Sequence, residues 1–414
     1  MDSKKRHYLR LCLIVIAISF YFFANVQRVA IPGAVFDLLQ GDLNTTAPKI
    51  TMLGAVFCYV YALTQLVVGI CVDKLGGFRV AAIGIVTFCT GALMFPYSDN
   101  FFFLYLSRAL LGFGSATFYL SSIREVKKYV KDKNFSLAVS YMLFVGYSGG
   151  IFANAPLVSL INITGWQKAF AYLGYFTLFI GLIYLIILFI FKPSHCDKEV
   201  KFSIEPFKEI LTKKENIYIY IFGGINYGLY YVLQSVIGKK FLQDFCYYGV
   251  NKSALILSLM AVVSAFAGVL TACISRAIGN KRAIIFKIVG IFSSLSTLSI
   301  CILLFLDIHT KIIALIFLLT AYIGSISPLL IYTLHLLNRY EISASAVAIQ
   351  SFNFFMIVGI LGEISGVLMH IFEPVNKNGV LIYPNESYIL VFGLFFLLSL
   401  VALVYSFKIK DEIN

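Results

Sequence analysis

The chain has 414 residues, of which 60% are hydrophobic and 13% are charged, and its mean hydropathy is +0.89. Soluble proteins carry roughly 25% charged residues, and one soluble core cannot bury this much apolar surface, so the composition excludes a soluble globular protein. The net charge of +13 does not indicate a nucleic-acid partner, because most basic residues lie in short loops between apolar runs, on one side of the membrane.

The apolar runs are long and continuous and lack the period-two alternation of barrel strands, which predicts helices. A spanning helix needs about 20 mostly apolar residues. Glycine, proline and charge clusters divide the chain into spans over residues 9–33, 50–71, 80–97, 101–122, 135–158 and 168–191, then 217–237, 252–274, 283–306, 312–335, 343–371 and 387–407. We therefore expect an all-α polytopic membrane protein with twelve spans.

The longest polar stretch divides these spans into two sets of six. We expect an N-terminal bundle over residues 1–191, a linker over 192–216 and a C-terminal bundle over 217–414. With the N-terminus inside, about 24 Lys and Arg fall on the inner side and about 7 on the outer side. The opposite orientation reverses this ratio. We expect a multi-pass protein of a bacterial inner membrane, with both termini and the linker in the cytoplasm.

The first span carries an arginine, which is costly in lipid and therefore a functional candidate. Tyr21 and Asn25 precede Arg28 by seven and three residues, so the three share one helical face. A guanidinium binds carboxylate or phosphate through two parallel hydrogen bonds. These three residues are candidate ligands for an anionic substrate. The alternative is an arginine that reaches the outer surface.

A short loop after the second span reads Gly69-Ile-Cys-Val-Asp73-Lys74-Leu-Gly76-Gly77-Phe-Arg79. Gly69 would allow close helix approach, and the glycine pair would allow a tight turn. Asp73 would cap a helix or pair with an arginine in one conformational state only. The alternative is an ordinary basic inner loop.

The fourth span carries a second arginine with a small and polar helical face. Arg108 is followed on that face by Gly112, Ser115, Tyr119 and Ser122, a stripe typical of a cavity wall. We expect Arg108 and Tyr119 to contact substrate. The alternative is a structural arginine that holds this span against a neighbour.

The second half offers polar and aromatic candidates in three spans. They are Tyr227, Tyr230 and Gln234 in the seventh span, Tyr332 and His335 in the tenth, and Gln350 and Asn353 in the eleventh. A tyrosine hydroxyl needs a partner in lipid, which favours a cavity wall over simple core packing. Glu363 is the only acidic residue deep in a predicted span. It is a candidate proton carrier, or a fixed partner for one of the basic residues.

The loop sequence resembles the G-x-x-x-D-[RK]-x-G-x-[RK]-[RK] signature of the major facilitator superfamily, at the place where that family has it. A degenerate copy, Ser275-Arg-Ala-Ile-Gly-Asn-Lys-Arg282, lies between spans eight and nine. Two further motifs, Arg108-x-x-x-Gly112 and Gly165-Trp-Gln-Lys-Ala-Phe170, also resemble family sequences. The stretch from Tyr21 to Arg28 resembles the organic-anion and sugar-phosphate branches. The resemblance implies two bundles related by an approximate twofold axis, with spans one, four, seven and ten lining a central cavity.

The expected function is secondary transport by alternating access, as proton-coupled uptake of a small polar metabolite bearing an anionic or carboxylate group. The family's antiporter motif in span five is poorly matched, because Ala155 replaces the glycine before Pro156. The alternatives are a proton-driven efflux antiporter and a non-transporting membrane sensor of the same fold. We expect no enzyme, cofactor or metal. The expected partners are the small-molecule substrate, a coupling proton and the lipid bilayer, and the protein is expected to be a monomer.

Overall fold

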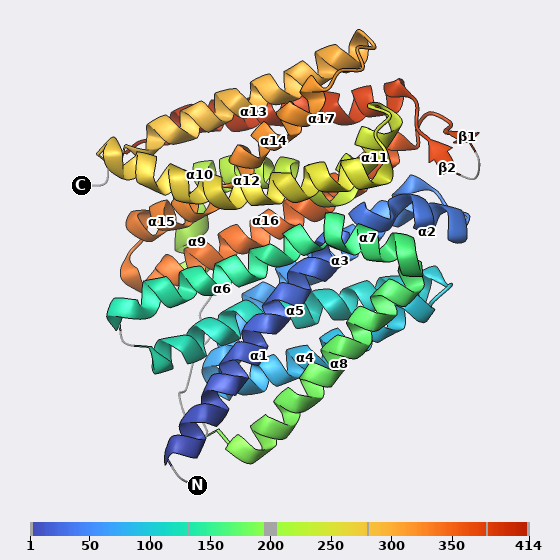
Figure 1. The fold of residues 1–414 in the computed structure, drawn as a ribbon. Coiled ribbons are helices and arrows are strands. Elements are labelled where there is room, and N and C mark those ends of the chain that lie inside the picture. Colours follow the sequence, from blue (N-terminus) through green and yellow to red (C-terminus); the bar gives the residue numbers. More distant parts are fainter. Residues whose placement is uncertain (1–2, 131, 194–204, 280, 378–379, 412–414) are drawn as a thin grey trace. The chain divides into compact units, whose positions relative to one another are not determined.

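The computed structural model describes residues 3–130, 132–193, 205–279, 281–377 and 380–411, and the chain is predominantly helical (Figure 1). Its contacts divide it into two compact units. Unit 1 comprises Met1–Ala30 and Val56–Phe202, and unit 2 comprises Ile31–Ala55 and Ser203–Asn414. Unit 2 thus includes a segment from the first quarter of the sequence. The predicted division at the linker stays a prediction, and residues 194–204 of that linker lie outside the described residues.

Unit 1 is a helical bundle in which long helices run side by side (Figure 1). Its described elements are α1 (Ser3–Ala30), the later part of α3 (Ala47–Leu75), α4 (Gly77–Met94), η2 (Phe95–Tyr97), α5 (Phe101–Tyr129), α6 (Asp132–Phe152), α7 (Ala155–Thr164) and α8 (Trp166–Phe191). Helices α4 and α5 pack closely because Gly84 faces Thr117 and Gly114 faces the Gly84 carbonyl, where a Cβ would stand 1.9 and 2.5 Å from those atoms. A bend of 43° separates α6 from α7, because Pro156 at the start of α7 cannot continue the hydrogen-bond ladder.

Unit 2 contains the remaining elements. They are η1 (Gly33–Val35), α2 (Phe36–Asp42), the first part of α3, α9 (Glu205–Thr212), α10 (Lys214–Val232), the π-helical turn η3 (Leu233–Ile237), α11 (Gly238–Asp244), α12 (Val250–Ala277), α13 (Arg282–Phe305), α14 (Ile312–Gly324), α15 (Ser327–Leu337), α16 (Tyr340–Met369), β1 (Val375–Lys377), β2 (Val380–Ile382) and α17 (Asn385–Lys408). Helix α10 packs on α16, and α13 packs on α17. Segment α2, helix α11 and the hairpin gather at one end of the unit (Figure 1).

Ten of the described helices are long and apolar enough to cross a membrane, or eleven if the bent α6–α7 pair is one span. The prediction of an all-α multi-pass protein is confirmed. The predicted seventh span, 217–237, is helical throughout but is not among the ten. Its asparagine, glycine and tyrosine residues lower its hydropathy, and the helix changes to a π-helical turn at Leu233. The antiparallel β1–β2 hairpin was not predicted, since each strand has three residues and is too short for an alternating pattern.

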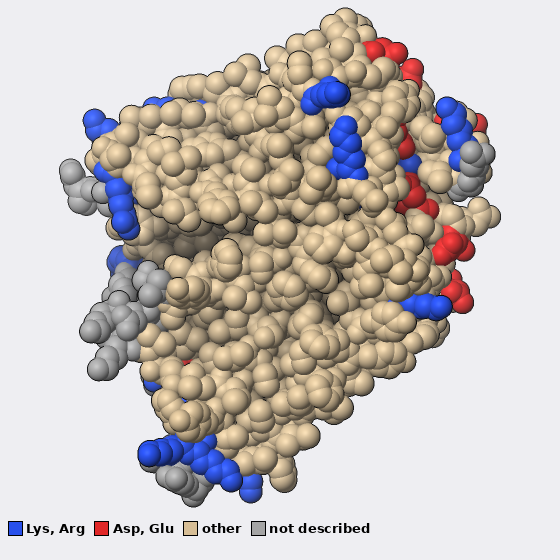
Figure 2. All heavy atoms as spheres, in the orientation of Figure 1, with Lys and Arg blue, Asp and Glu red and all other residues tan. Residues whose placement is uncertain are grey.

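The surface carries its charge unevenly. Figure 2 shows broad uncharged flanks along the helices, with Lys and Arg gathered at helix ends, including the end of unit 1 where α1 begins. Large apolar side chains are exposed on these flanks, including Phe189 at 77% and Ile186 at 60%. Lipid rather than water suits such flanks.

Candidate functional site

The predicted polar face of α1 is present in unit 1. The Arg28 side chain donates from Nη2 to Oδ1 of Asn25 at 2.5 Å, and Asn25 donates from Nδ2 to the Tyr21 carbonyl at 2.9 Å. Helical spacings of three and four residues bring these groups together. Arg28 is only 9% exposed, so its guanidinium lies among the helices rather than at the surface.

The second predicted arginine, Arg108, meets the same part of α1. It is fully buried, donates from Nη1 to the Gln27 carbonyl at 3.0 Å, and holds its guanidinium carbon 4.7 Å from the centre of the Phe57 ring. Arg108 therefore connects α5 to both α1 and α3. The Gln27 carbonyl precedes Arg28 directly, so the contacts of the two arginines fall on adjacent residues of α1.

The stripe that follows Arg108 along α5 has two parts. Gly112 packs on α3, where a Cβ would stand 2.6 Å from the Phe57 carbonyl oxygen, so this position serves helix packing. Farther along, Ser115 and Ser122 are buried, and their hydroxyls have no hydrogen-bond partner among the described residues. Tyr119 is half-buried, with its ring centre 5.4 Å from that of Tyr21. The polar part of the stripe thus begins at Ser115.

The aromatic candidates of unit 2 form a packed group on α10. Tyr227 stacks on Phe354 of α16 with ring centres 4.3 Å apart, and Tyr231 lies 4.4 Å from Tyr227. Tyr230 packs against Gly324, where a Cβ would stand 2.3 Å from its ring. Gln234 is buried in η3.

Other residues predicted in unit 2 lie in different surroundings. Tyr332 is 51% exposed under the Arg282 guanidinium, with 4.7 Å between the guanidinium carbon and the ring centre, and His335 is exposed near the end of α15. Asn353 donates from Nδ2 to the Tyr220 carbonyl at 2.7 Å, which is a helix-packing contact. Glu363 is half-buried on α16, and its proposed proton role stays a prediction.

Gln350 is the most unusual polar side chain near the aromatic group. It is fully buried, yet neither its amide nitrogen nor its amide oxygen has a hydrogen-bond partner among the described residues. Its nitrogen lies 3.0 Å from the position a Cβ would take at Gly223 of α10. A buried amide without partners costs free energy, so a ligand that satisfied it would gain binding energy there.

The loop after α3 keeps its predicted turn. Gly76 has φ +87°, a conformation that favours glycine, and it precedes α4 directly. Arg79 donates to the Pro193 carbonyl at 3.0 Å, and Lys74 is exposed. Asp73 is 60% exposed and lies 3.8 Å from Arg124 of α5, a weak surface ion pair.

Two details of that loop differ from the predictions. Gly69 makes no close approach, since a Cβ there would meet no atom within 4 Å. The close approach is at Gly77, where a Cβ would stand 2.6 Å from the Ser121 carbonyl oxygen. The side chain that caps α4 is Glu125, which accepts a hydrogen bond from the Gly77 N–H at 3.0 Å. Glu125 lies 48 residues farther along the chain, so its role depends on helix packing that the loop sequence does not contain.

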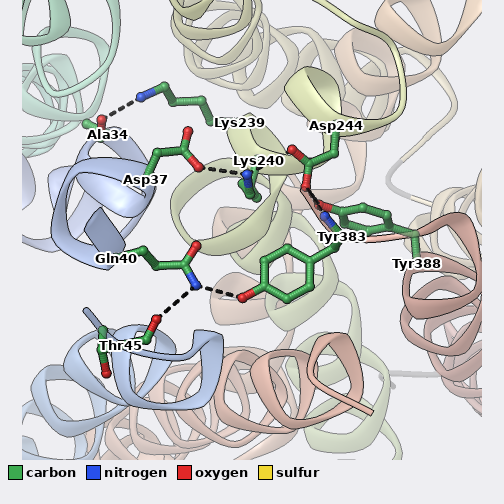
Figure 3. Close-up of polar contacts among 9 residues, drawn as sticks. All are labelled: Ala34, Asp37, Gln40, Thr45, Lys239, Lys240, Asp244, Tyr383 and Tyr388. Atoms are coloured by element: carbon green, nitrogen blue, oxygen red, sulfur yellow. Dashed lines mark hydrogen bonds and ion pairs between the residues drawn. The ribbon is translucent and has the colours of Figure 1, made fainter. Parts of the chain in front are cut away.

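A buried ion network at one end of unit 2 was not predicted (Figure 3). The Lys240 ammonium lies 2.7 Å from an Asp37 carboxylate oxygen and 2.8 Å from one of Asp244. The Asp244 carboxylate also accepts hydrogen bonds from the Tyr383 N–H at 3.0 Å and the Tyr388 hydroxyl at 2.8 Å. We call Asp37, Lys240 and Asp244 the Lys240 network. It joins α2, α11 and the segment after the hairpin.

Two neighbouring contacts extend this network. Lys239 donates to the Ala34 carbonyl at 2.6 Å, and Gln40 donates to the Tyr383 hydroxyl at 2.6 Å (Figure 3). Helix α11 begins after residue 237, where the predicted seventh span ends. Burial raises the pKa of the Asp244 carboxyl to about 6, although Lys240 beside it acts in the opposite direction. This carboxyl therefore exchanges its proton closer to neutral pH than an ordinary aspartate does.

Curated relatives match about half of the chain or less. A protein of Cupriavidus necator named probable sulfoacetate transporter SauU is 26% identical over 214 residues, 50% of this chain and 47% of that protein. An ascorbate transporter of Arabidopsis thaliana chloroplasts is 27% identical over 207 residues, 49% of this chain and 37% of that protein. An uncharacterized transporter of Bacillus subtilis, YybO, is 30% identical over 173 residues, 41% and 38% of the two chains. The chain thus spans less than half the length of each of these relatives.

Solved structures show the same fold over nearly the whole chain. A bacterial homologue of the human lysosomal transporter Spinster, inward-facing and unoccupied, has a TM-score of 0.74 at 15% identity, with 100% of this chain and 98% of that chain covered. The nucleoside transporter NupG has a TM-score of 0.70 at 15% identity, with coverage of 96% and 98%. The sequence pattern of the Major Facilitator Superfamily matches residues 12–363. Over more than half of its length, then, the chain carries the pattern of one family, and it belongs to the Major Facilitator Superfamily.

Proposed function

We propose that this protein is a secondary active transporter that moves a small organic anion across the membrane by alternating access. The observation that carries the proposal is the pair of buried guanidiniums in unit 1, Arg28 at 9% exposure and Arg108 at 0%. Burying two positive charges in a membrane bundle is costly, and such charges commonly mark a substrate path. Their planar donors match carboxylate, sulfonate or phosphate oxygens.

The relatives support the class of substrate. Two of them are named as sulfoacetate and ascorbate transporters, and others as anion transporters. Their names concern those proteins, and the identity between each and this chain lies between 25 and 30%. We extend to this chain only the shared chemistry, a small solute with an anionic group. Tyr21, Asn25 and Tyr119 would contact the neutral part of the solute.

A binding screen tests this proposal. Purified protein is expected to unfold at a higher temperature with a carboxylate, sulfonate or sugar phosphate than with a neutral sugar or nucleoside of similar size. A ligand at a hundred times its Kd adds about 2.7 kcal/mol to the free energy of unfolding. Compounds that bind would then be assayed for uptake into proteoliposomes. Stabilisation by neutral compounds alone would refute the anion proposal.

We further propose proton-coupled uptake by a monomer in a bacterial inner membrane, with both termini cytoplasmic. Glu363 of α16 is the proposed proton carrier, because it is the only carboxyl deep in a predicted span and a carboxyl within a span commonly belongs to a proton path. Proton-driven efflux and a non-transporting sensor are the alternatives. The sensor would bind the anion without moving it, so the uptake assay separates it from a transporter.

Glu363→Gln tests the coupling. The glutamine keeps the shape of the side chain but cannot release a proton, so uptake driven by a pH gradient is expected to fall to background. Exchange of labelled for unlabelled solute, which needs no net proton movement, is expected to persist. Glu373→Gln, an identical change at an exposed position, is the control. If Glu363→Gln loses both activities or keeps both, Glu363 is a structural partner or a bystander.

A further inference from the structure

A pocket with a basic wall lies at the end of unit 1 where α1 begins. Its volume is about 170 Å³, and it lies between the start of α1, the α3–α4 turn and the ends of α5 and α8. Four basic side chains line it, Arg6, Arg10, Arg79 and Lys128, against one acidic side chain, Glu125. We call it the end pocket. Blue atoms gather at this end of unit 1 in Figure 2.

Aromatic and backbone contacts hold the arginines of the end pocket in place. The guanidinium carbons of Arg6 and Arg10 lie 5.6 and 5.7 Å from the centre of the same ring, that of Phe191 at the end of α8. Phe191 is itself buried edge-on against Phe78 of α4, with ring centres 5.6 Å apart. Arg79 is oriented by its hydrogen bond to the Pro193 carbonyl. A ligand would therefore find these donors already placed, at little entropic cost.

The charge of the wall is unbalanced. One carboxylate oxygen of Glu125 already accepts from the Gly77 N–H at 3.0 Å and from Lys128 at 3.1 Å, so this acid and Lys128 offset each other. Within the described part of the chain, neither Arg6 nor Arg10 forms an ion pair. Three guanidiniums thus converge on the pocket with no carboxylate left over to balance them. This excess favours an anion with several acceptor oxygens.

We propose that the end pocket binds a phosphate-bearing anion, and that its occupant is the headgroup of an anionic phospholipid. Arginine forks match phosphate oxygens, and basic pockets between helix ends at the membrane surface bind anionic headgroups. The same end of α8 exposes Ile186, Phe189 and Ile190, which offer an apolar surface for acyl chains beside the headgroup. A free phosphate would use only the pocket and not this surface. The proposal is independent of the transported solute.

The test is thermal unfolding of the full-length protein in mixed micelles that contain either phosphatidylglycerol or phosphatidylcholine. We expect phosphatidylglycerol to raise the unfolding temperature and phosphatidylcholine not to. In the Arg6→Gln/Arg10→Gln variant, about tenfold more phosphatidylglycerol should be needed for the same rise, since a charge-assisted contact of this kind changes Kd by at least that factor. Both side chains are at least partly exposed, so the variant is expected to fold, and its unfolding temperature in phosphatidylcholine verifies this.

Two comparisons separate the outcomes. Arg276→Gln removes an exposed arginine at the end of α12 in unit 2 and should leave the phosphatidylglycerol response intact. Inorganic phosphate and glycerol phosphate test the headgroup chemistry without acyl chains. If these salts stabilise the protein and phosphatidylglycerol does not, the site takes a free phosphate and the lipid assignment is wrong. An equal response to both lipids, or an unchanged response in the Arg6→Gln/Arg10→Gln variant, would overturn the proposal.

Discussion

Arg28→Ala is expected to weaken substrate binding by about 2–5 kcal/mol, the cost of removing one partner of a buried, hydrogen-bonded charge pair. Arg28→Lys keeps the positive charge but loses the planar fork, so binding should weaken by less. Asn25, which accepts from Arg28, would lose that partner in both variants. Lys168→Ala, at an exposed position of the same unit, is the matched control and should bind substrate normally.

The decisive measurement for Arg28 is a double-mutant-style cycle with a neutral substrate analogue. The unmodified protein and the Arg28→Ala variant are each tested with the anionic substrate and with its amide or ester. If Arg28 contacts the anionic group, the analogue binds poorly to the unmodified protein and loses little more on mutation. Simple addition of the two losses would show that Arg28 does not touch the anion. Its role would then lie in the structure around Asn25.

Lys240→Met is expected to lower the free energy of unfolding by about 3–5 kcal/mol, because it leaves buried carboxylates without their cation. Asp244 is 7% exposed, and the Asp37 side chain is 14% exposed. Methionine has nearly the same length as lysine, so the loss is electrostatic rather than a cavity. The measurement is thermal unfolding of purified protein in detergent, followed by helix content.

Two further variants isolate the charge effect. Lys252→Met makes the same change at an exposed site on α12 and should change stability by less than about 0.5 kcal/mol. Adding Asp244→Asn to Lys240→Met removes one of the stranded charges and should recover part of the loss. Should Lys240→Met unfold at the same temperature as Lys252→Met, the Lys240 network contributes nothing to stability.

Local sequence predicted those features that depend on local spacing. Continuous apolar runs predicted the helices, because lipid leaves the backbone no other partners. The three-residue spacing of Asn25 and Arg28 predicted their shared face, and a hydrogen bond joins them. The two glycines before α4 predicted its turn, and Gly76 has the positive φ that the turn requires.

Features that depend on how distant helices meet could not be predicted. Arg108 binds a carbonyl 81 residues away, and Glu125 caps a helix 48 residues away. Such contacts depend on helix rotations that periodicity does not fix. Lys240 and Asp244 are four residues apart, the one readable sign of the network. Asp37 gave no such sign, since a charge near a helix end is usually a solvated loop residue.

The composition of unit 2 has a consequence for biosynthesis. Ala34 and Lys239, which share a hydrogen bond, are 205 residues apart in the sequence. At a synthesis rate of 5–20 residues per second, the early segment waits roughly 10–40 s at the ribosome and translocon before α11 exists. A fragment that starts after the linker would insert its helices yet lack Asp37 and Ala34. Co-production with a fragment ending after residue 55 should restore these partners, so a split protein would reassemble through Ile31–Ala55.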